Sequence, residues 1–189
     1  MSNFSDPQRT IQLIERARQG NSDAIGELYE CHRLSIYRYF YYRTGDTQQA
    51  DDLTSEVFLR MIRALPGYRH QDTAFLAWLF RIAQNLLNDH YRRMNVRNQV
   101  TLEEDMMENI TSSRTRPVEH SLNSVTLQQA LNVLSVDQRD VIVLRFVAGM
   151  PIAEVAQTLQ KSEDAVKALQ RRALITLRDV LSDWEVQYA

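Results

Sequence analysis

The sequence predicts an all-α protein made of two small helical domains joined by a flexible acidic linker. Five Gly and four Pro among 189 residues are too few to build the turns of a sandwich or barrel of short strands. Apolar residues recur at helical spacing through most of the chain. The stretch 94–124 breaks this pattern, since it is acidic and rich in Asn, Ser and Thr. We therefore expect domains at 1–93 and 125–189.

Composition excludes several classes of protein. A hydrophobic fraction of 44% is too high for a chain that is disordered over most of its length. A single cysteine, Cys31, excludes an internal disulfide framework and fits a reducing cytosol. The N-terminus has no secretory pattern, and no apolar run approaches the length of a membrane span. We expect a cytoplasmic protein without membrane insertion.

The N-terminal domain shows three helical patterns in order. Apolar residues at helical spacing over 25–36 lead into the aromatic run 37–43. Asp46 and Gln49 resemble a capping box, which opens a helix that stops at Pro66-Gly67. After a loop at 68–73, apolar residues from Phe75 onward predict a long amphipathic helix to about Arg93.

The C-terminal domain predicts a further series of helices. One contains Leu127, Leu131 and Leu134, and a second capping box, Ser135 with Gln138, opens a helix that ends near Gly149. Pro151 suits the first turn of a short helix at 152–159. After a break at 160–161, Ser162 is a good N-cap for a final helix to about Leu181.

The charge is distributed unevenly, although Lys+Arg 22 and Asp+Glu 24 nearly cancel. Residues 60–93 carry six positive and two negative side chains, and residues 161–178 carry five and two, on an acidic background. Each basic segment could bind a polyanion, and each taken alone is equally consistent with an ordinary solvated helix face.

The segment 151–178 has the pattern of a helix-turn-helix. Lys167, Arg171 and Arg178 recur on one helical face, with Arg172 beside them, where they could contact phosphates and guanines in a major groove. The alternative is a basic, exposed helix in a plain bundle. The tight turn lacks the usual Gly, so Gln160 is expected to take a left-handed conformation.

Three segments, 51–65, 75–93 and 133–174, resemble the extracytoplasmic-function (ECF) RNA polymerase sigma factors of the sigma-70 family. The resemblance covers about residues 20–93 and 125–180, in the family's order with a variable linker between them. It implies a region 2 domain, a region 4 domain, and a protein that binds core RNA polymerase. Such a protein directs promoter-specific transcription initiation by recognising a −35 duplex and a melted −10 element.

The resemblance assigns the helix at 51–65 to docking on the clamp helices of the polymerase's largest subunit. The matching positions are Asp52, Leu53, Ser55, Glu56, Phe58, Leu59 and Arg60. Many relatives have Gln where this chain has Ser55. We expect Leu53 and Val57 to pack in the core, and the charged residues of this helix to be better candidates for the interface.

The resemblance assigns the loop at 68–73 and the helix after it to the −10 strand, which needs a pocket for a flipped base and a basic track for the backbone. The amide of Asn85 could read a base edge there. The candidate contacts are Asn85, Asn88, Arg81, Tyr68, Arg69, Arg92 and Arg93. Trp78 could stack on a base, but its place on the apolar face favours the core.

In region 4 the resemblance implies contacts with bases and with the phosphate backbone of the −35 element. The matching positions are Lys167, Ala168, Arg171, Arg172, Lys161, Ser162 and Arg145. The acidic linker would run through the polymerase interior. The implied partners are core RNA polymerase (clamp helices and flap), promoter DNA and an anti-sigma factor, although no residue identifies the last.

The chain has no P-loop, dinucleotide-binding or zinc-protease motif, and its four histidines are scattered. We expect no metal, no cofactor and no enzymatic activity. Two other functions remain open at this point. A self-sufficient helix-turn-helix regulator would bind duplex DNA tightly without polymerase, and a helical adaptor or anti-sigma protein would use its basic faces to bind acidic proteins.

Overall fold

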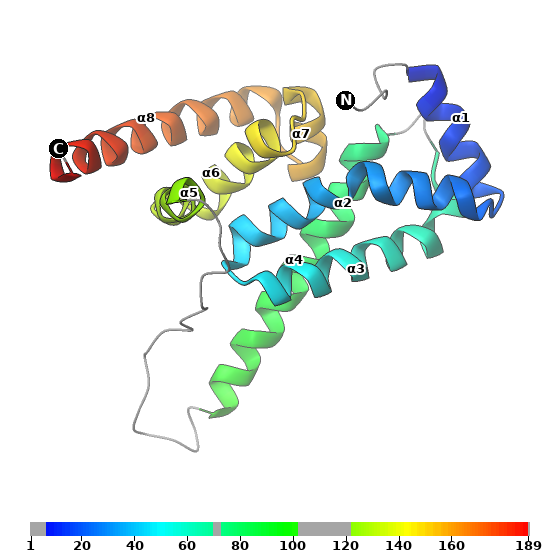
Figure 1. The fold of residues 1–189 in the computed structure, drawn as a ribbon, viewed down its shortest axis with the longest axis horizontal. Coiled ribbons are helices and arrows are strands. Elements are labelled where there is room, and N and C mark those ends of the chain that lie inside the picture. The colour runs from blue at the N-terminus through cyan, green and yellow to red at the C-terminus, as the bar shows by residue number, and fades with distance from the viewer. Residues whose placement is uncertain (1–6, 70–72, 102–121, 189) are drawn as a thin grey trace.

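A computed structural model describes residues 7–69, 73–101 and 122–188, and within these ranges the secondary structure is entirely helical (Figure 1). The predicted all-α class is therefore confirmed. The first four α-helices precede residues 102–121, and the last four follow them. The elements in order are α1 (Pro7–Arg18), α2 (Ser22–Thr44), α3 (Thr47–Ala64), η1 (Leu65–Gly67), α4 (Phe75–Thr101), α5 (Leu122–Asn132), α6 (Val136–Ile142), η2 (Val143–Val147), α7 (Ile152–Leu159) and α8 (Glu163–Tyr188).

Side-chain caps fix where the N-terminal helices begin and end. The Asn21 carboxamide oxygen accepts the Ala24 N–H at 2.8 Å at the start of α2, which ends at Gly45 with φ 74°. The Asp46 carboxylate accepts the Gln49 N–H at 2.9 Å and opens α3. These caps satisfy backbone groups that have no partner inside the helix. The tight reversal at 45–46 packs α3 against α2.

The C-terminal half contains the predicted capping box and turn. The Gln138 N–H donates to Ser135 Oγ and the Ser135 N–H donates to Gln138 Oε1, which opens α6. Gln160, at φ 53° and ψ 42°, is in the left-handed conformation, and the Lys161 N–H closes the end of α7 on Ala156 O. The helix-turn-helix α7–α8 therefore forms with Gln160 at the position that usually favours glycine.

The two halves of the chain pack against each other and share one hydrophobic core. α7 packs on α4, and the α6–η2 segment packs on α2. Figure 1 shows α5 to α8 gathered on one side of α2, while the far end of α4 projects away from them. The Gln128 amide also donates to Tyr41 O at 3.2 Å across this boundary.

A buried ion pair lies between the halves. Arg43 Nε in α2 is 3.1 Å from Asp140 Oδ1 in α6, and each side chain is only 5% exposed. The Tyr39 hydroxyl donates to the same carboxylate oxygen at 3.3 Å, and the Tyr91 hydroxyl of α4 donates to Arg43 O at 2.7 Å. Helices α2, α4 and α6 therefore meet at one polar cluster inside the protein.

The helices run further than the apolar periodicity predicts. α4 continues to Thr101 instead of ending near Arg93, and α8 continues to Tyr188 instead of Leu181. Residues 94–101 and 122–124, which the sequence pattern assigned to the linker, are helical, and the rest of that linker lies outside the described residues. Neither extension contains Gly or Pro, so nothing stops the helix where the apolar face ends. α1 was not predicted.

Candidate nucleic-acid interface

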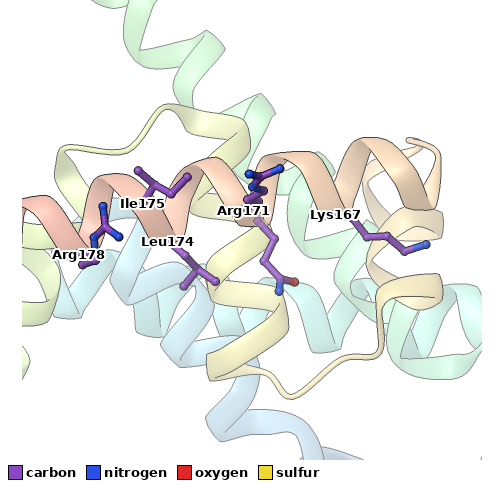
Figure 2. Close-up of a pocket in the computed structure, with 6 residues that line it drawn as sticks. Lys167, Arg171, Leu174, Ile175 and Arg178 are labelled. Carbon is purple, nitrogen blue, oxygen red and sulfur yellow. The ribbon is translucent and has the colours of Figure 1, made fainter.

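Helix α8 presents a basic face on which the predicted contacts lie. Lys167, Ala168, Arg171 and Arg172 are all exposed, because Val166 and Ala173 take the core side of the helix. Six residues of this helix line a shallow groove, and Figure 2 shows them along successive turns. They are Lys167, Gln170, Arg171, Leu174, Ile175 and Arg178.

Two exposed carboxylates in the first turn of α8, those of Glu163 and Asp164, lie near Lys167. Ser162 is exposed and caps the helix, accepting the Ala165 N–H at 3.2 Å. Lys167 Nζ lies 3.2 Å from Asp164 and 4.0 Å from Glu163. Ion pairs between exposed side chains contribute little free energy, so a DNA phosphate can displace them. Lys167 therefore remains available to a polyanion.

Two of the predicted phosphate contacts already have partners within the C-terminal half of the chain. The Arg145 guanidinium donates to Met150 O and, at 3.3 Å, to Gln170 Oε1. Lys161 forms an ion pair with Asp137 at 3.0 Å. Arg145 thereby fastens the loop before α7 to α8, a structural role that the sequence did not reveal.

Helix α4 carries the second set of predicted contacts. Asn85, Asn88, Arg92 and Arg93 are exposed on it, and Arg92 pairs with Asp89 at 3.0 Å. Arg81 is half-buried, and its Nη2 donates to Gln157 O of α7 at 2.7 Å. The predicted −10 contacts at 85, 88, 92 and 93 are therefore accessible on α4, whereas α7 partly covers the first turns of this helix.

The loop before α4 differs from the expectation at one residue. Tyr68 is buried, and its hydroxyl donates to Thr73 O at 2.7 Å. Its ring packs 4.7 Å from Trp78 and 5.6 Å from Phe75. Burial, with the nearby charge of Glu154, raises the pKa of Tyr68 to about 12. In this conformation Tyr68 shapes the loop and presents no free ring to a base, while its neighbour Arg69 is exposed.

Trp78 lies in the same aromatic cluster. It is half-buried and packs against the rings of Tyr68 and Phe75, with 5.6 Å between its ring and that of Phe75. These contacts favour a packing role over a stacking platform. Residues 70–72 of the predicted loop lie outside the described residues.

Helix α3 carries the candidate docking face. Asp52, Ser55 and Leu59 are exposed, whereas Leu53 and Phe58 pack in the core with Val57. Leu53 and Phe58 therefore position the helix and offer little surface to a partner.

The charged pair of α3 lies on its accessible side. Arg60 Nε donates to Glu56 Oε1 at 2.8 Å, and this hydrogen bond lowers the pKa of Glu56. Glu56 therefore stays ionised well below neutral pH, and the pair offers both signs of charge to a partner.

Sequence reasoning missed one residue of this face. Ile62 is 42% exposed and lies one turn from Leu59, which is 49% exposed. The signal was available, because an i, i+3 apolar pair outside the buried stripe of an amphipathic helix marks a second face. Leu59 and Ile62 form an apolar strip on α3.

The described part of the chain was also searched for metal sites and membrane-spanning helices. Its His, Cys, Asp and Glu side chains form no group of three that could hold a metal ion. None of its helices is long and apolar enough to cross a membrane.

Two family models match the chain, one over each half. The model described as Sigma-70 region 2 matches residues 28–97, and the model described as Sigma-70, region 4 matches residues 130–179. Together they include α3, most of α4 and the helix-turn-helix.

Curated relatives match over most of their length. The chain is 41% identical over 180 residues to the ECF RNA polymerase sigma factor BldN of Streptomyces coelicolor, covering 95% of this chain and 68% of BldN. It is 30% identical over 157 residues to the ECF RNA polymerase sigma factor SigX of Bacillus subtilis, covering 80% of each chain.

Solved structures share the fold. CnrH in complex with the cytosolic domain of CnrY superposes with a TM-score of 0.71 at 26% identity, over 90% of this chain and 96% of that one. The sigma factor RpoE in complex with the anti-sigma factor NepR, from Bartonella quintana, gives 0.66 at 21% identity over 83% and 96%.

Proposed function

This chain belongs to the ECF group of RNA polymerase sigma factors, and on that premise we propose how its helices divide the work of promoter-specific transcription initiation. α3 docks on core polymerase, α4 holds the melted −10 strand, and α8 enters the major groove of the −35 element. Two basic helices on separate halves of one chain are the observation that carries this proposal.

The −35 role of α8 is supported by its exposed cations. Arg171 and Arg172 lie in the middle of the face, where planar guanidinium groups can donate two parallel hydrogen bonds to a guanine. Lys167 lies one turn earlier, nearer the helix N-terminus, and suits a phosphate. The neighbouring Leu174 and Ile175 could make apolar contacts with a thymine methyl group.

The −10 role of α4 is supported by amides and cations on one exposed stretch. Asn85 and Asn88 are one turn apart and can donate to and accept from a base edge. Arg92 and Arg93 continue the face and suit the phosphates of a single strand. Arg81 joins this set only when α7 moves away from it.

The chain itself carries out no chemical step in this proposal. Core polymerase supplies the polymerisation chemistry, and the sigma factor supplies position and base recognition. The work takes place in the cytoplasm, where core polymerase and the chromosome are located. The proteins in the two similar solved structures are held by CnrY and by the anti-sigma factor NepR, which supports an anti-sigma partner for this chain as well.

Run-off transcription tests the proposal. Sheared genomic DNA from the bacterium that encodes this chain is transcribed by its purified core polymerase, with and without the protein. We expect new transcripts whose upstream sequences share two motifs, about 10 and about 35 bases before the start. A folded protein that binds no core polymerase and yields no new transcripts would contradict the proposal and favour the self-sufficient regulator.

A variant pair assigns the −35 role within the same assay. Arg171→Ala with Arg172→Ala removes the guanine donors, and each lost base contact weakens discrimination by about 1–3 kcal/mol. We expect at least a tenfold loss of transcripts from the new start sites. Arg16→Ala, which removes an exposed arginine of α1, is the control and should leave them unchanged.

A further inference from the structure

Arg145 holds one atom of a side chain that lines the groove on α8. Arg145 lies in η2, a widened helical turn in which the Ala148 N–H donates to Val143 O at 3.0 Å. From there its guanidinium donates to Met150 O and, through Nε at 3.3 Å, to Gln170 Oε1. One arginine therefore joins η2, the loop before α7 and helix α8.

The chemistry of Arg145 fixes which end of the Gln170 amide faces it. A guanidinium group has N–H donors and no acceptor, so only the amide oxygen can meet it. The other end of the amide, Nε2, forms no hydrogen bond with any residue that the structure describes. Because Gln170 is partly exposed and lines the groove, the end that it can offer to a ligand there is a donor.

The other polar groups around this groove also donate. Lys167, Arg171 and Arg178 line it with ammonium and guanidinium groups, and the two remaining lining residues are apolar (Figure 2). None of these side chains offers an acceptor. A glutamine with both ends free would offer one donor end and one acceptor end. With its oxygen held by Arg145, Gln170 offers the groove donors alone.

Bases differ in the groups that they present in the major groove. Adenine presents an acceptor beside a donor, and the amide of a free glutamine can read both. Guanine presents two acceptors, O6 and N7. A glutamine that can only donate lacks the second hydrogen bond to adenine and keeps its contact with guanine. The held amide of Gln170 is therefore suited to guanine.

We propose that Gln170 reads a guanine of the −35 element as a hydrogen-bond donor, and that Arg145 is the positioning residue that holds the amide in this orientation. The proposal rests on the proposed −35 role of α8. Arg145 thus acts on base choice through Gln170, without itself touching a base.

Transcription from a promoter library tests this pair. A promoter found by run-off transcription is given random bases at its −35 element, and the transcripts that core polymerase makes from each member are counted by sequencing. Gln170→Met removes the amide at similar volume. Arg145→Met releases the amide oxygen, and Arg145→Lys keeps a donor beside it. Gln129→Met changes an exposed glutamine of α5 outside the groove and is the control.

We expect the wild type to prefer guanine about tenfold at one position of the −35 element, and Gln170→Met to prefer it there by about twofold or less. Arg145→Met should shift the preference at the same position from guanine towards adenine. Arg145→Lys and Gln129→Met should keep the preference for guanine. Arg145→Met combined with Gln170→Met should behave as Gln170→Met alone, because Arg145 acts through Gln170.

Gln170→Glu separates base reading from the stability of the fold. Its carboxylate keeps an acceptor for Arg145, and a charged hydrogen bond of this kind is stronger than one to an amide. The end that faces the groove becomes an acceptor, which guanine O6 and N7 repel. We expect this variant to unfold at the same or a higher temperature than the wild type, and to lose the preference for guanine.

A purely structural role of the pair predicts a different pattern. It would lower transcription from all library members alike and leave the base preferences unchanged. If Gln170→Met and Gln170→Glu keep every base preference, or weaken transcription equally for all sequences, the proposal is wrong. An Arg145→Met protein that is folded and still prefers guanine would contradict the positioning role. Thermal unfolding followed by circular dichroism checks that each variant is folded.

The wild type separates this proposal from the proposed function. If the wild type shows base preferences at the −35 element that do not depend on Gln170, this proposal alone fails. If it yields no transcripts, or transcripts that do not depend on the −35 sequence, the proposed −35 role of α8 fails, and the reading by Gln170 fails with it.

Discussion

At the scale of single residues, Asp140 is the most informative side chain of the protein. It is buried in α6 and faces Arg43 and Tyr39 of α2, Tyr91 of α4, and Asp137 and Arg139 of its own helix. Burial, only partly offset by the attraction of Arg43, raises the pKa of Asp140 to about 6. The packed form therefore binds a proton at this carboxylate more readily than a solvent-exposed form does.

The sign of the resulting pH dependence follows directly. Because the pKa of Asp140 is higher in the packed form, the protonated carboxyl group stabilises that form. This stabilisation is fully present below about pH 4 and is lost as the pH rises through about 6. The rise of the Asp140 pKa from 3.8 to about 6 corresponds to about 3 kcal/mol. Glu154, whose pKa burial also raises, lies on α7 at the α7–α4 contact and acts in the same direction. We expect the halves to separate more readily at pH 7.5 than at pH 5.

Energy transfer between dyes on the two halves measures this separation. Transfer should fall as the pH rises from 5 to 7.5, and most of the change should vanish in Arg43→Met with Asp140→Leu. If this double variant keeps the full pH dependence, Asp140 is not the source of that dependence.

The sequence predicted some residues better than others, for physical reasons. Gln160 was correctly expected to be left-handed, because a tight turn between two short helices restricts its backbone locally. The Arg43–Asp140 pair could not be predicted, because 97 residues separate its members and only the packing of α6 on α2 brings them together. The burial of Tyr68 has the same origin, since its partners come from the next helix.

At the scale of elements, helix α3 makes the clearest prediction. Leu59 and Ile62 are exposed, so replacing both by Ser should change the free energy of unfolding by no more than about 0.5 kcal/mol each. Exposed apolar patches bordered by polar residues commonly mark protein–protein interaction sites. We expect Leu59→Ser with Ile62→Ser to weaken binding to core polymerase by at least tenfold.

A control on α2 makes that result specific. Leu34→Ser replaces another exposed leucine, 53% accessible, outside the proposed docking helix. Labelled proteins titrated with core polymerase give the three affinities. An equal loss of affinity for core polymerase in both variants would contradict the docking role of α3.

Element starts were predicted more accurately than element ends. The caps at Asp46, Ser135 and Ser162 involve residues three apart in the chain, and all three form. The ends of α4 and α8 were placed too early, because they were judged by the loss of an apolar face. A helix lacking Gly and Pro continues past that point. α1 lacks a capping signal at its start and was not predicted.

At the scale of the whole molecule, the two halves of the chain share one hydrophobic core. Periodicity and charge identified both basic helices, but could not show that they pack together, since each half has its own apolar faces.

Crosslinking to promoter DNA tests the proposed roles of α4 and α8. A photoreactive amino acid is placed at Asn85 or at Arg171, and the crosslinked base is mapped in complexes of polymerase, this protein and a promoter found by run-off transcription. We expect crosslinks from position 85 to the −10 strand and from position 171 to the −35 duplex. Crosslinks from both positions to one DNA segment, or from position 171 to protein alone, would contradict these roles.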